Sequence, residues 1–184
     1  MNDLSLHVID IIQNSVSAGA TLITLAVEED TAADVMRITI EDNGRGMNAE
    51  QVARLDDPFF TTRTTRRVGM GIPLLRQTAE QSGGSLTVES QVGKGTRVSA
   101  LLGHSNIDRP PLGDIANCFV LMASANPDIE FVLDYTYDGR DYRLDTTEVK
   151  EILDGIPINT PSVIRMLQEM VAGNIEELKS PEEN

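Results

Sequence analysis

The 184-residue sequence has one cysteine, no tryptophan and no long apolar run. A single cysteine, Cys118, excludes an internal disulfide, and its apolar neighbours predict a buried, inert thiol. Because aromatic residues make up only 4% of the chain, the core must be mainly aliphatic. No apolar stretch approaches the roughly 18 residues of a membrane span, and the N-terminal segment lacks the pattern of a signal peptide. We therefore expect a cytoplasmic protein with no membrane partner.

Basic residues are also scarce. Lys and Arg number 15 against 29 Asp and Glu, which gives a formal net charge of -14. This charge argues against nucleic acid as a partner, because the phosphate backbone would be repelled. The surplus lies mainly in residues 105–184, which hold 16 acidic and 6 basic side chains. That part is either an ordinary solvated surface or a face for a basic protein partner.

Apolar periodicity predicts the elements of the first part of the chain. Helical spacing connects Leu4, Val8, Ile11, Ile12 and Ser15. Helices are predicted over residues 3–18, 48–57 and 72–82. Strands are predicted over residues 21–28, 34–41, 85–91 and 96–102. This order predicts an α+β two-layer sandwich, in which helices cover one face of a mixed or antiparallel sheet.

The second part follows a segment with two prolines and no apolar pattern, which is typical of a linker. Beyond it the pattern predicts a helix, a hairpin that turns at Asp138 and Gly139, and two more helices, the last from Pro161 to about Val171. This small α+β extension would cover a sheet edge or form a homodimer. The predicted organisation is a first domain, a linker, the extension and a disordered tail, over residues 1–104, 105–113, 114–179 and 180–184.

The motif DNGRGM begins at the end of the second predicted strand. The carboxylate of Asp42, fixed at a strand end, can accept a hydrogen bond from the exocyclic amine of adenine. Gly44 and Gly46 would let the backbone turn sharply beside the base. Taken alone, the motif is equally an ordinary Asp-Asn-Gly turn.

A second glycine pair, Gly69 and Gly71, precedes a predicted helix. Free backbone N–H groups and the positive end of the helix dipole could bind phosphate there, or the pair could simply close a flexible loop. A Rossmann site is excluded, because no strand precedes the glycines and the third glycine is absent. On the first helix, Asn14 offers a carbonyl oxygen suited to Mg²⁺, and Asp10 lies one turn before it.

These elements in this order resemble the Bergerat-fold ATP-binding domain of the GHKL superfamily, which includes DNA gyrase, large heat-shock chaperones, MutL proteins and histidine kinases. DIIQNS resembles its N box, DNGRGM its first glycine box, DPFFTTR the F box of histidine kinases, GMGIPLL its second glycine box and GKGT its last. The resemblance covers about residues 4–103. The F box and the short lid are most similar to those of histidine-kinase catalytic domains.

The resemblance implies ATP and Mg²⁺ as ligands. By position, it implies that Asn14 chelates Mg²⁺, that Asp42 binds the adenine amine and that Thr96 supports the adenine through water. The residues implied to hold the base are Asp42, Gly44, Gly46, Met47, Ile72 and Thr96. Those implied to hold the metal and phosphates are Asn14, Arg63, Arg66, Arg67, Gly69 and Gly71.

The sequence departs from the family pattern at the catalytic position. Hydrolysing members usually carry a glutamate four residues before the Mg²⁺ asparagine, and here that residue is Asp10. Asp10 could act as a general base or could support Asn14. Histidine kinases also need an acceptor histidine, normally on a helical pair just before this domain. Neither His7, in the N box, nor His104, in the linker, resembles such a site, so we expect the acceptor on another protein.

Two classes of function remain. The first is a histidine-kinase-like ATPase or kinase that acts in trans on a partner protein. The second is a nucleotide-gated protein-binding switch, like anti-sigma members of the superfamily, with little turnover. Both require a protein partner, and Asp10 favours the first.

Overall fold

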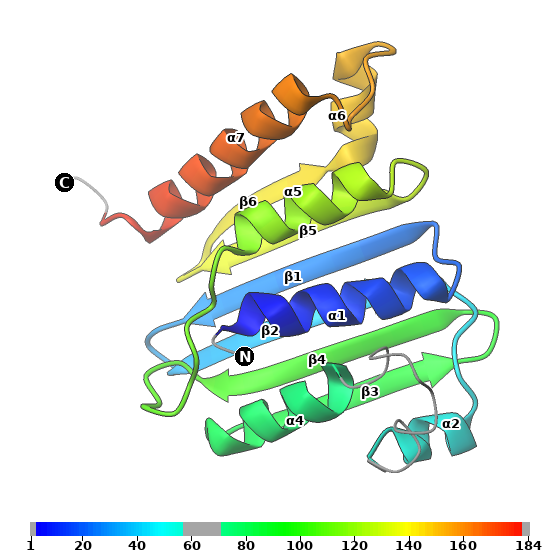
Figure 1. Cartoon of the computed structure of the whole chain (residues 1–184). Helices are drawn as coiled ribbons and strands as arrows, with labels where there is room; N and C mark the ends of the chain where they lie inside the picture. The colour runs from blue at the N-terminus through cyan, green and yellow to red at the C-terminus, as the bar shows by residue number, and fades with distance from the viewer. Residues whose placement is uncertain (1–2, 57–70, 182–184) are drawn as a thin grey trace.

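The protein is built on one six-stranded mixed sheet, seen in a computed structural model that describes residues 3–56 and 71–181 (Figure 1). In spatial order its strands are β3 (Ser85–Gln91), β4 (Gly95–Gly103), β2 (Val35–Asp42), β1 (Leu22–Asp30), β5 (Glu130–Tyr137) and β6 (Arg140–Asp145). All neighbours are antiparallel except β1 and β5, which run parallel. The hairpin predicted to turn at Asp138 and Gly139 is confirmed as β5 and β6. Of the two kinds of sheet that the sequence allowed, mixed and antiparallel, the protein forms the mixed one.

Helices cover one face of this sheet, as the sequence predicts (Figure 1). They are α1 (Leu4–Ser17), α4 (Gly71–Gln81), α5 (Ile115–Ala125) and α7 (Pro161–Lys179). In the described part of the chain, the short helices α2 (Ala49–Ala53) and α6 (Thr146–Leu153) lie near the ends of the sheet, and the short helix η1 (Arg54–Asp56) directly follows α2. Within the described ranges, no helix combines the length and apolar character needed to cross a bilayer.

The alternating pattern of β1 and β2 explains why the protein has two layers. Ile23, Leu25 and Val27 of β1 are buried beneath the helices, together with Met36, Ile38 and Ile40 of β2. The alternate residues of both strands point to the opposite face, and Glu28 and Arg37 are exposed there. Packing one face of a sheet against amphipathic helices removes its apolar side chains from water. This burial stabilises the fold by about 25 cal/mol for each Å² of apolar surface.

The C-terminal extension continues the sheet. β5 pairs with β1 from Leu22↔Glu130 onward, so the hairpin of β5 and β6 covers the edge that β1 would otherwise expose. Its core contains the large aromatic side chains, with Phe119 and Phe131 packed edge to face at 6.2 Å. Burial also raises the pKa of the Cys118 thiol, in agreement with an inert cysteine.

The last helix is longer than the sequence indicated. We expected it to end near Val171, but α7 continues to Lys179. The reason is that Val171 and Ile175 extend the buried stripe begun by Val163 and Leu167, and this packing outweighs the low helix propensity of Gly173.

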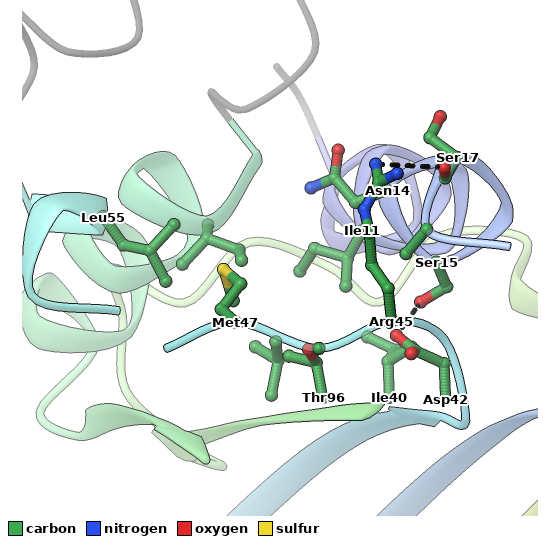
Figure 2. A pocket seen from close by; sticks show the side chains of 14 residues that line it. Ile11, Asn14, Ser15, Ser17, Ile40, Asp42, Arg45, Met47, Leu55 and Thr96 are labelled. Atoms are coloured by element: carbon green, nitrogen blue, oxygen red, sulfur yellow. Dashed lines mark hydrogen bonds between the residues drawn. The ribbon is translucent and has the colours of Figure 1, made fainter. Parts of the chain in front are cut away.

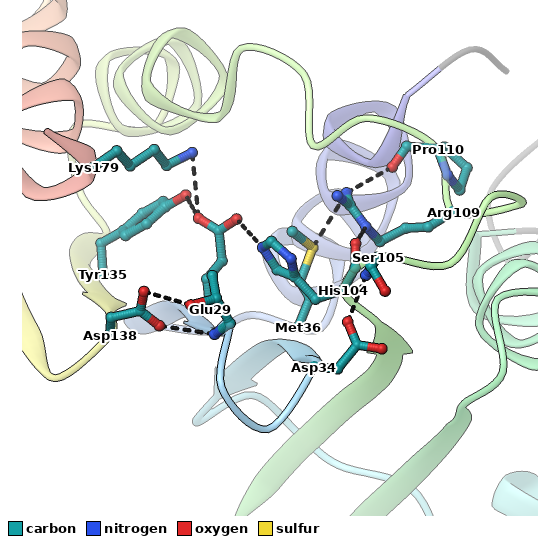
Figure 3. A network of polar contacts seen from close by, with 11 residues as sticks. Glu29, Asp34, Met36, His104, Ser105, Arg109, Pro110, Tyr135, Asp138 and Lys179 are labelled. Carbon is teal, nitrogen blue, oxygen red and sulfur yellow. Dashed lines mark hydrogen bonds and ion pairs between the residues drawn. The ribbon is translucent and has the colours of Figure 1, made fainter. Parts of the chain in front are cut away.

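A buried glutamate joins the extension to the first part of the chain (Figure 3). Glu29, at the end of β1, is 5% exposed and accepts a hydrogen bond from the Tyr135 hydroxyl of β5. Its carboxylate also lies 3.1 Å from His104 Nε2 and 3.3 Å from Lys179 Nζ of α7. Burial alone would raise the pKa of the Glu29 carboxyl, but the contacts with Tyr135, Lys179 and His104 outweigh it, and the pKa lies below its ordinary value.

Glu29→Ala should therefore lower the free energy of unfolding by about 3 kcal/mol at pH 7, because it leaves a buried hydroxyl and a lysine without their acceptor. Because the pKa of Glu29 is lower in the folded state, its ionised carboxylate stabilises the fold fully at pH values above the unfolded pKa of about 4.3. This stabilisation is lost as the pH falls through the folded-state pKa. The difference in the free energy of unfolding between Glu29→Ala and wild type should therefore become smaller below about pH 4. Urea unfolding at pH 7 and at low pH measures both effects.

Glu28→Ala is the matched control for this measurement. Glu28 precedes Glu29 on β1, but its side chain is half exposed and its nearest ion-pair atom, on Arg37, is 3.8 Å away. Exposed pairs of this kind contribute at most about 1 kcal/mol. Equal losses for the two variants would show that the buried network does not hold the extension in place.

Candidate functional site

A cavity of about 250 Å³ lies between α1 and the sheet, beside the first glycine motif (Figure 2). Its apolar walls come from Ile11, Ile40, Met47, Leu55, Ile72 and Val98. Its polar side chains come from Asn14, Ser15, Ser17, Asp42, Arg45 and Thr96. Apolar walls with a few fixed polar groups suit a flat heterocycle that is recognised at one edge.

Asp42 is held at the end of β2 by two hydrogen bonds. The buried Ser15 hydroxyl of α1 donates to Oδ2 at 2.6 Å, and the Gly44 backbone N–H donates to Oδ1 at 2.8 Å. A carboxylate has two lone pairs on each oxygen, so both oxygens can still accept a hydrogen bond from a ligand. Because of the two hydrogen bonds from Ser15 and Gly44, the orientation of the Asp42 carboxylate is set before any ligand binds.

The strand register places Asp42 in a row with two hydroxyl residues. Asp42 is directly opposite Thr96 of β4, and Thr96 is directly opposite Ser90 of β3. The Thr96 and Ser90 hydroxyl oxygens lie 2.8 Å apart. The Met47 backbone N–H donates to the same Ser90 oxygen at 2.8 Å. Asp42 and Thr96 form the polar floor of the cavity, and the row joins the first glycine motif to the last.

Two glycines allow these motifs to touch. Gly46 has φ of 69°, and a Cβ there would meet the Gln91 carbonyl oxygen at 2.0 Å. Gly95 has φ of 126°, and a Cβ there would meet the Asp42 carbonyl oxygen at 1.9 Å. Any side chain at either position would force the strand ends apart, so both positions require glycine.

The second glycine motif brings α4 against α1. Gly71 is the first residue of α4, and a Cβ on it would come within 2.8 Å of the Asp10 Cβ. The half-buried Asp10 therefore lies beside the N-terminus of α4. Asn14 follows one turn later on α1 and lines the cavity. A group bound in the cavity that extended toward α4 would meet Asn14 and Asp10, with the positive end of the helix dipole beyond.

The structure brings most of the described candidate residues together. Those that line the cavity are Asn14, Asp42, Gly46, Met47, Ile72 and Thr96. Those that adjoin it in the surrounding backbone are Asp10, Gly44 and Gly71. Four other candidates, with the F box and lid, lie outside the described residues: Arg63, Arg66, Arg67 and Gly69. The ligands and roles assigned to all these residues stay predictions.

Sequence reasoning missed four polar residues of the site, among them Ser17, which lines the cavity on α1. Ser15 was interpreted only as part of the apolar stripe of α1, although a polar side chain at a buried position was the available signal. Arg45 donates to the Ser17 carbonyl at 3.3 Å and forms part of the cavity wall. Ser90 gave no signal, because its contacts depend on the register of β3 with β4.

Comparison with known proteins agrees with this geometry. Residues 2–105 match the family described as "Histidine kinase-, DNA gyrase B-, and HSP90-like ATPase". The sensor protein kinase FleS of Pseudomonas aeruginosa is 35% identical over 95 residues, which are 52% of this chain and 23% of FleS. The sensor histidine kinase ZraS of Klebsiella oxytoca is 36% identical over 74 residues, which are 40% of this chain and 16% of ZraS. The matches thus span less than a quarter of either kinase.

Among solved structures, the N-terminal domain of a DNA repair protein has a similar fold, with a TM-score of 0.54 and 17% sequence identity. The similarity covers 79% of this chain and 53% of that domain. At this level of identity it shows the α+β fold alone.

Proposed function

The chain belongs to the histidine kinase-, DNA gyrase B- and HSP90-like ATPase family, and from this premise we propose that it binds MgATP in the cavity beneath α1 and transfers its γ-phosphoryl group to a partner protein or to water. The observation that carries the proposal is the fixed Asp42 carboxylate on the floor of a cavity with apolar walls. The membership assigns an ATP-binding, kinase-like module, and the residue roles below are our proposals.

The adenine would lie between the apolar walls, with its amine on Asp42. Met47 and Ile72 would contact the ring, and Thr96 would support it directly or through water. The chemistry of the row fits this ligand, because Asp42 offers only acceptors and the adenine amine offers only donors. Ser15 and Gly44 would support binding by keeping the carboxylate in place.

The phosphates would extend toward the N-terminus of α4. Asn14 would coordinate Mg²⁺ through its side-chain oxygen, with the phosphates supplying other ligands, as is usual for this ion. The backbone amides of Gly69 and Gly71 would bind phosphate oxygens. Arg63, Arg66 or Arg67 would add positive charge at the γ-phosphate.

Asp10 is the proposed general base. It lies one turn before Asn14 and against the first residue of α4, which is where the γ-phosphate would be reached by water or by an acceptor group. Its side chain is one methylene shorter than the glutamate that the family usually carries. The close packing of Gly71 on Asp10 brings the two helices together there, which fits a shorter acid.

We propose that the phosphoryl acceptor lies on another protein. Neither histidine of these 184 residues is placed to be phosphorylated. His7 is 5% exposed, and burial lowers the pKa of its imidazole. His104 is hydrogen-bonded to the buried Glu29. The partner would be recruited by the acidic C-terminal extension, and a homodimer stays a prediction.

The second candidate function is a nucleotide-gated switch that binds its partner with little turnover. The observation that favours it is exposed apolar surface on the extension, where Ile152 is 84% exposed and Ile156 is 54% exposed. Both functions use the same nucleotide cavity, so they differ only in whether the bound ATP is consumed.

Calorimetric titration with ATP, with and without Mg²⁺, followed by phosphate release on the same sample, tests the proposal. We expect binding that Mg²⁺ strengthens, and we expect Asn14→Ala to lose this strengthening while it keeps metal-free binding within a factor of about three. Gln13→Ala is the control, because the exposed Gln13 lies on the same helix outside the cavity. Absence of binding would contradict the proposal, and binding without turnover would favour the switch.

A further inference from the structure

The Ser90 hydroxyl group makes three contacts with a single proton. Its oxygen accepts from the Met47 N–H at 2.8 Å, lies 2.9 Å from the Gly95 carbonyl oxygen, and lies 2.8 Å from the Thr96 hydroxyl. Ser90 is half-buried beside the polar floor of the cavity. Which of its neighbours receives the proton decides what the neighbouring Thr96 can offer to a ligand.

Hydrogen-bond chemistry selects one arrangement. The Gly95 carbonyl oxygen can only accept, so the Ser90 proton must point to it for that contact to be a hydrogen bond. The Thr96 hydroxyl must then donate its own proton to Ser90. In this arrangement the Met47 N–H, the Ser90 hydroxyl and the Thr96 hydroxyl all donate to an acceptor. Thr96 is left with no proton for the cavity and with free lone pairs on its oxygen.

We propose that Ser90 is a positioning residue that makes Thr96 a hydrogen-bond acceptor toward the cavity, and that this polarity selects adenine over 6-oxopurines. The inference rests on the proposed binding of ATP in this cavity. It adds a residue that does not line the cavity and that sets the polarity of the floor through Thr96. Together with Asp42, whose two oxygens already accept from Ser15 and Gly44, Thr96 gives the floor a row of acceptors.

The polarity matters because the two kinds of purine present opposite edges. Adenine has a 6-amino donor, whereas guanine has a 6-oxo acceptor. Hypoxanthine has the same 6-oxo acceptor and a protonated N1. An acceptor row pairs with the amine and repels the oxo group. If one water lies between, it donates one hydrogen to Thr96 and has the other for the unprotonated N1 of adenine, which a 6-oxopurine lacks.

The test is the ratio of the dissociation constants of ATP and inosine triphosphate, measured with Mg²⁺ on wild type and on Ser90→Ala. In the variant, Thr96 loses its acceptor and can turn its proton into the cavity. We expect ATP to bind about fivefold more weakly and the preference for ATP over inosine triphosphate to fall about tenfold. A purely structural role for Ser90 would weaken both nucleotides equally and leave the ratio unchanged, which would overturn the inference.

Two further variants make the result specific. Ser90→Thr keeps a hydroxyl at this position and should restore most of the wild-type ratio. Ser99→Ala is the matched control, because Ser99 also pairs with a threonine across strands, its oxygen lying 3.2 Å from that of Thr39, but it points to the opposite face of the sheet. It should leave the ratio unchanged. A wild type that binds neither nucleotide would contradict the proposed function, whereas binding with an unchanged ratio in Ser90→Ala would contradict only the role of Ser90.

Discussion

Asp42→Asn should weaken ATP binding by roughly a hundredfold or more while the protein stays folded. The carboxylate accepts from Ser15 and from the Gly44 N–H, and we propose that it also accepts from the adenine amine. An amide has only one oxygen for these three donors, so its NH₂ group must face one of them. Loss of a charged acceptor and creation of an unpaired donor cost about 3 kcal/mol together, which is roughly a hundredfold in affinity.

Glu41→Gln is the matched control for Asp42→Asn. It makes the same acid-to-amide change one residue earlier on β2, but Glu41 is exposed on the opposite face of the sheet. Calorimetric titration should therefore give it wild-type ATP affinity, and thermal unfolding should show that both variants fold. Unchanged affinity in Asp42→Asn would remove the whole assignment of the cavity to ATP.

Periodicity was enough to predict the sheet of the first part and the side that it buries. Large apolar side chains recur at every second residue, at Ile23, Leu25 and Val27, and a strand with this pattern buries them on one face. The glycine motifs were also informative, because Gly46 and Gly95 occupy positions where no side chain fits. Local chemistry of this kind can be found from sequence, since each signal depends on a few neighbouring residues.

Contacts between distant segments could not be found in this way. The parallel pairing of β5 with β1 joins residues about a hundred positions apart, and neither strand carries a signal for the other. The same limit hid Ser90, whose role depends on the register of two strands, and Glu29, which directly follows the strand predicted over residues 21–28. Burial of Glu29 requires Tyr135 and Lys179, and these come from the extension. Polar groups buried by tertiary packing were therefore the part of the structure that sequence reasoning missed.

Asp10→Asn should leave MgATP binding within a factor of about three of wild type and slow phosphate release by roughly a hundredfold to ten-thousandfold. The reason is that an amide cannot take a proton from water or from an acceptor group, and general base catalysis contributes rate factors of this size. Asparagine has nearly the same shape as aspartate. The packing of Asp10 against Gly71 at the start of α4 should therefore be preserved.

Asp10→Glu separates the need for a carboxylate from the need for this side-chain length. It keeps a base but moves the carboxylate outward by one methylene. The extra methylene has to fit beside α4, where a Cβ built on Gly71 would come within 2.8 Å of the Asp10 Cβ. A general base at this position should give Asp10→Glu more turnover than Asp10→Asn, with nucleotide affinity similar in both.

The two roles open to Asp10 predict different results in one pair of measurements. If Asp10 acts as the base, Asp10→Asn loses turnover and keeps the strengthening of ATP binding by Mg²⁺. If it instead supports Asn14 one turn away, the variant loses that strengthening together with turnover, because a misplaced Asn14 oxygen no longer reaches the metal. Turnover equal to wild type would exclude Asp10 from both roles. A wild type that binds MgATP without releasing phosphate would favour a nucleotide-gated switch, which needs no general base because it does not hydrolyse the ATP.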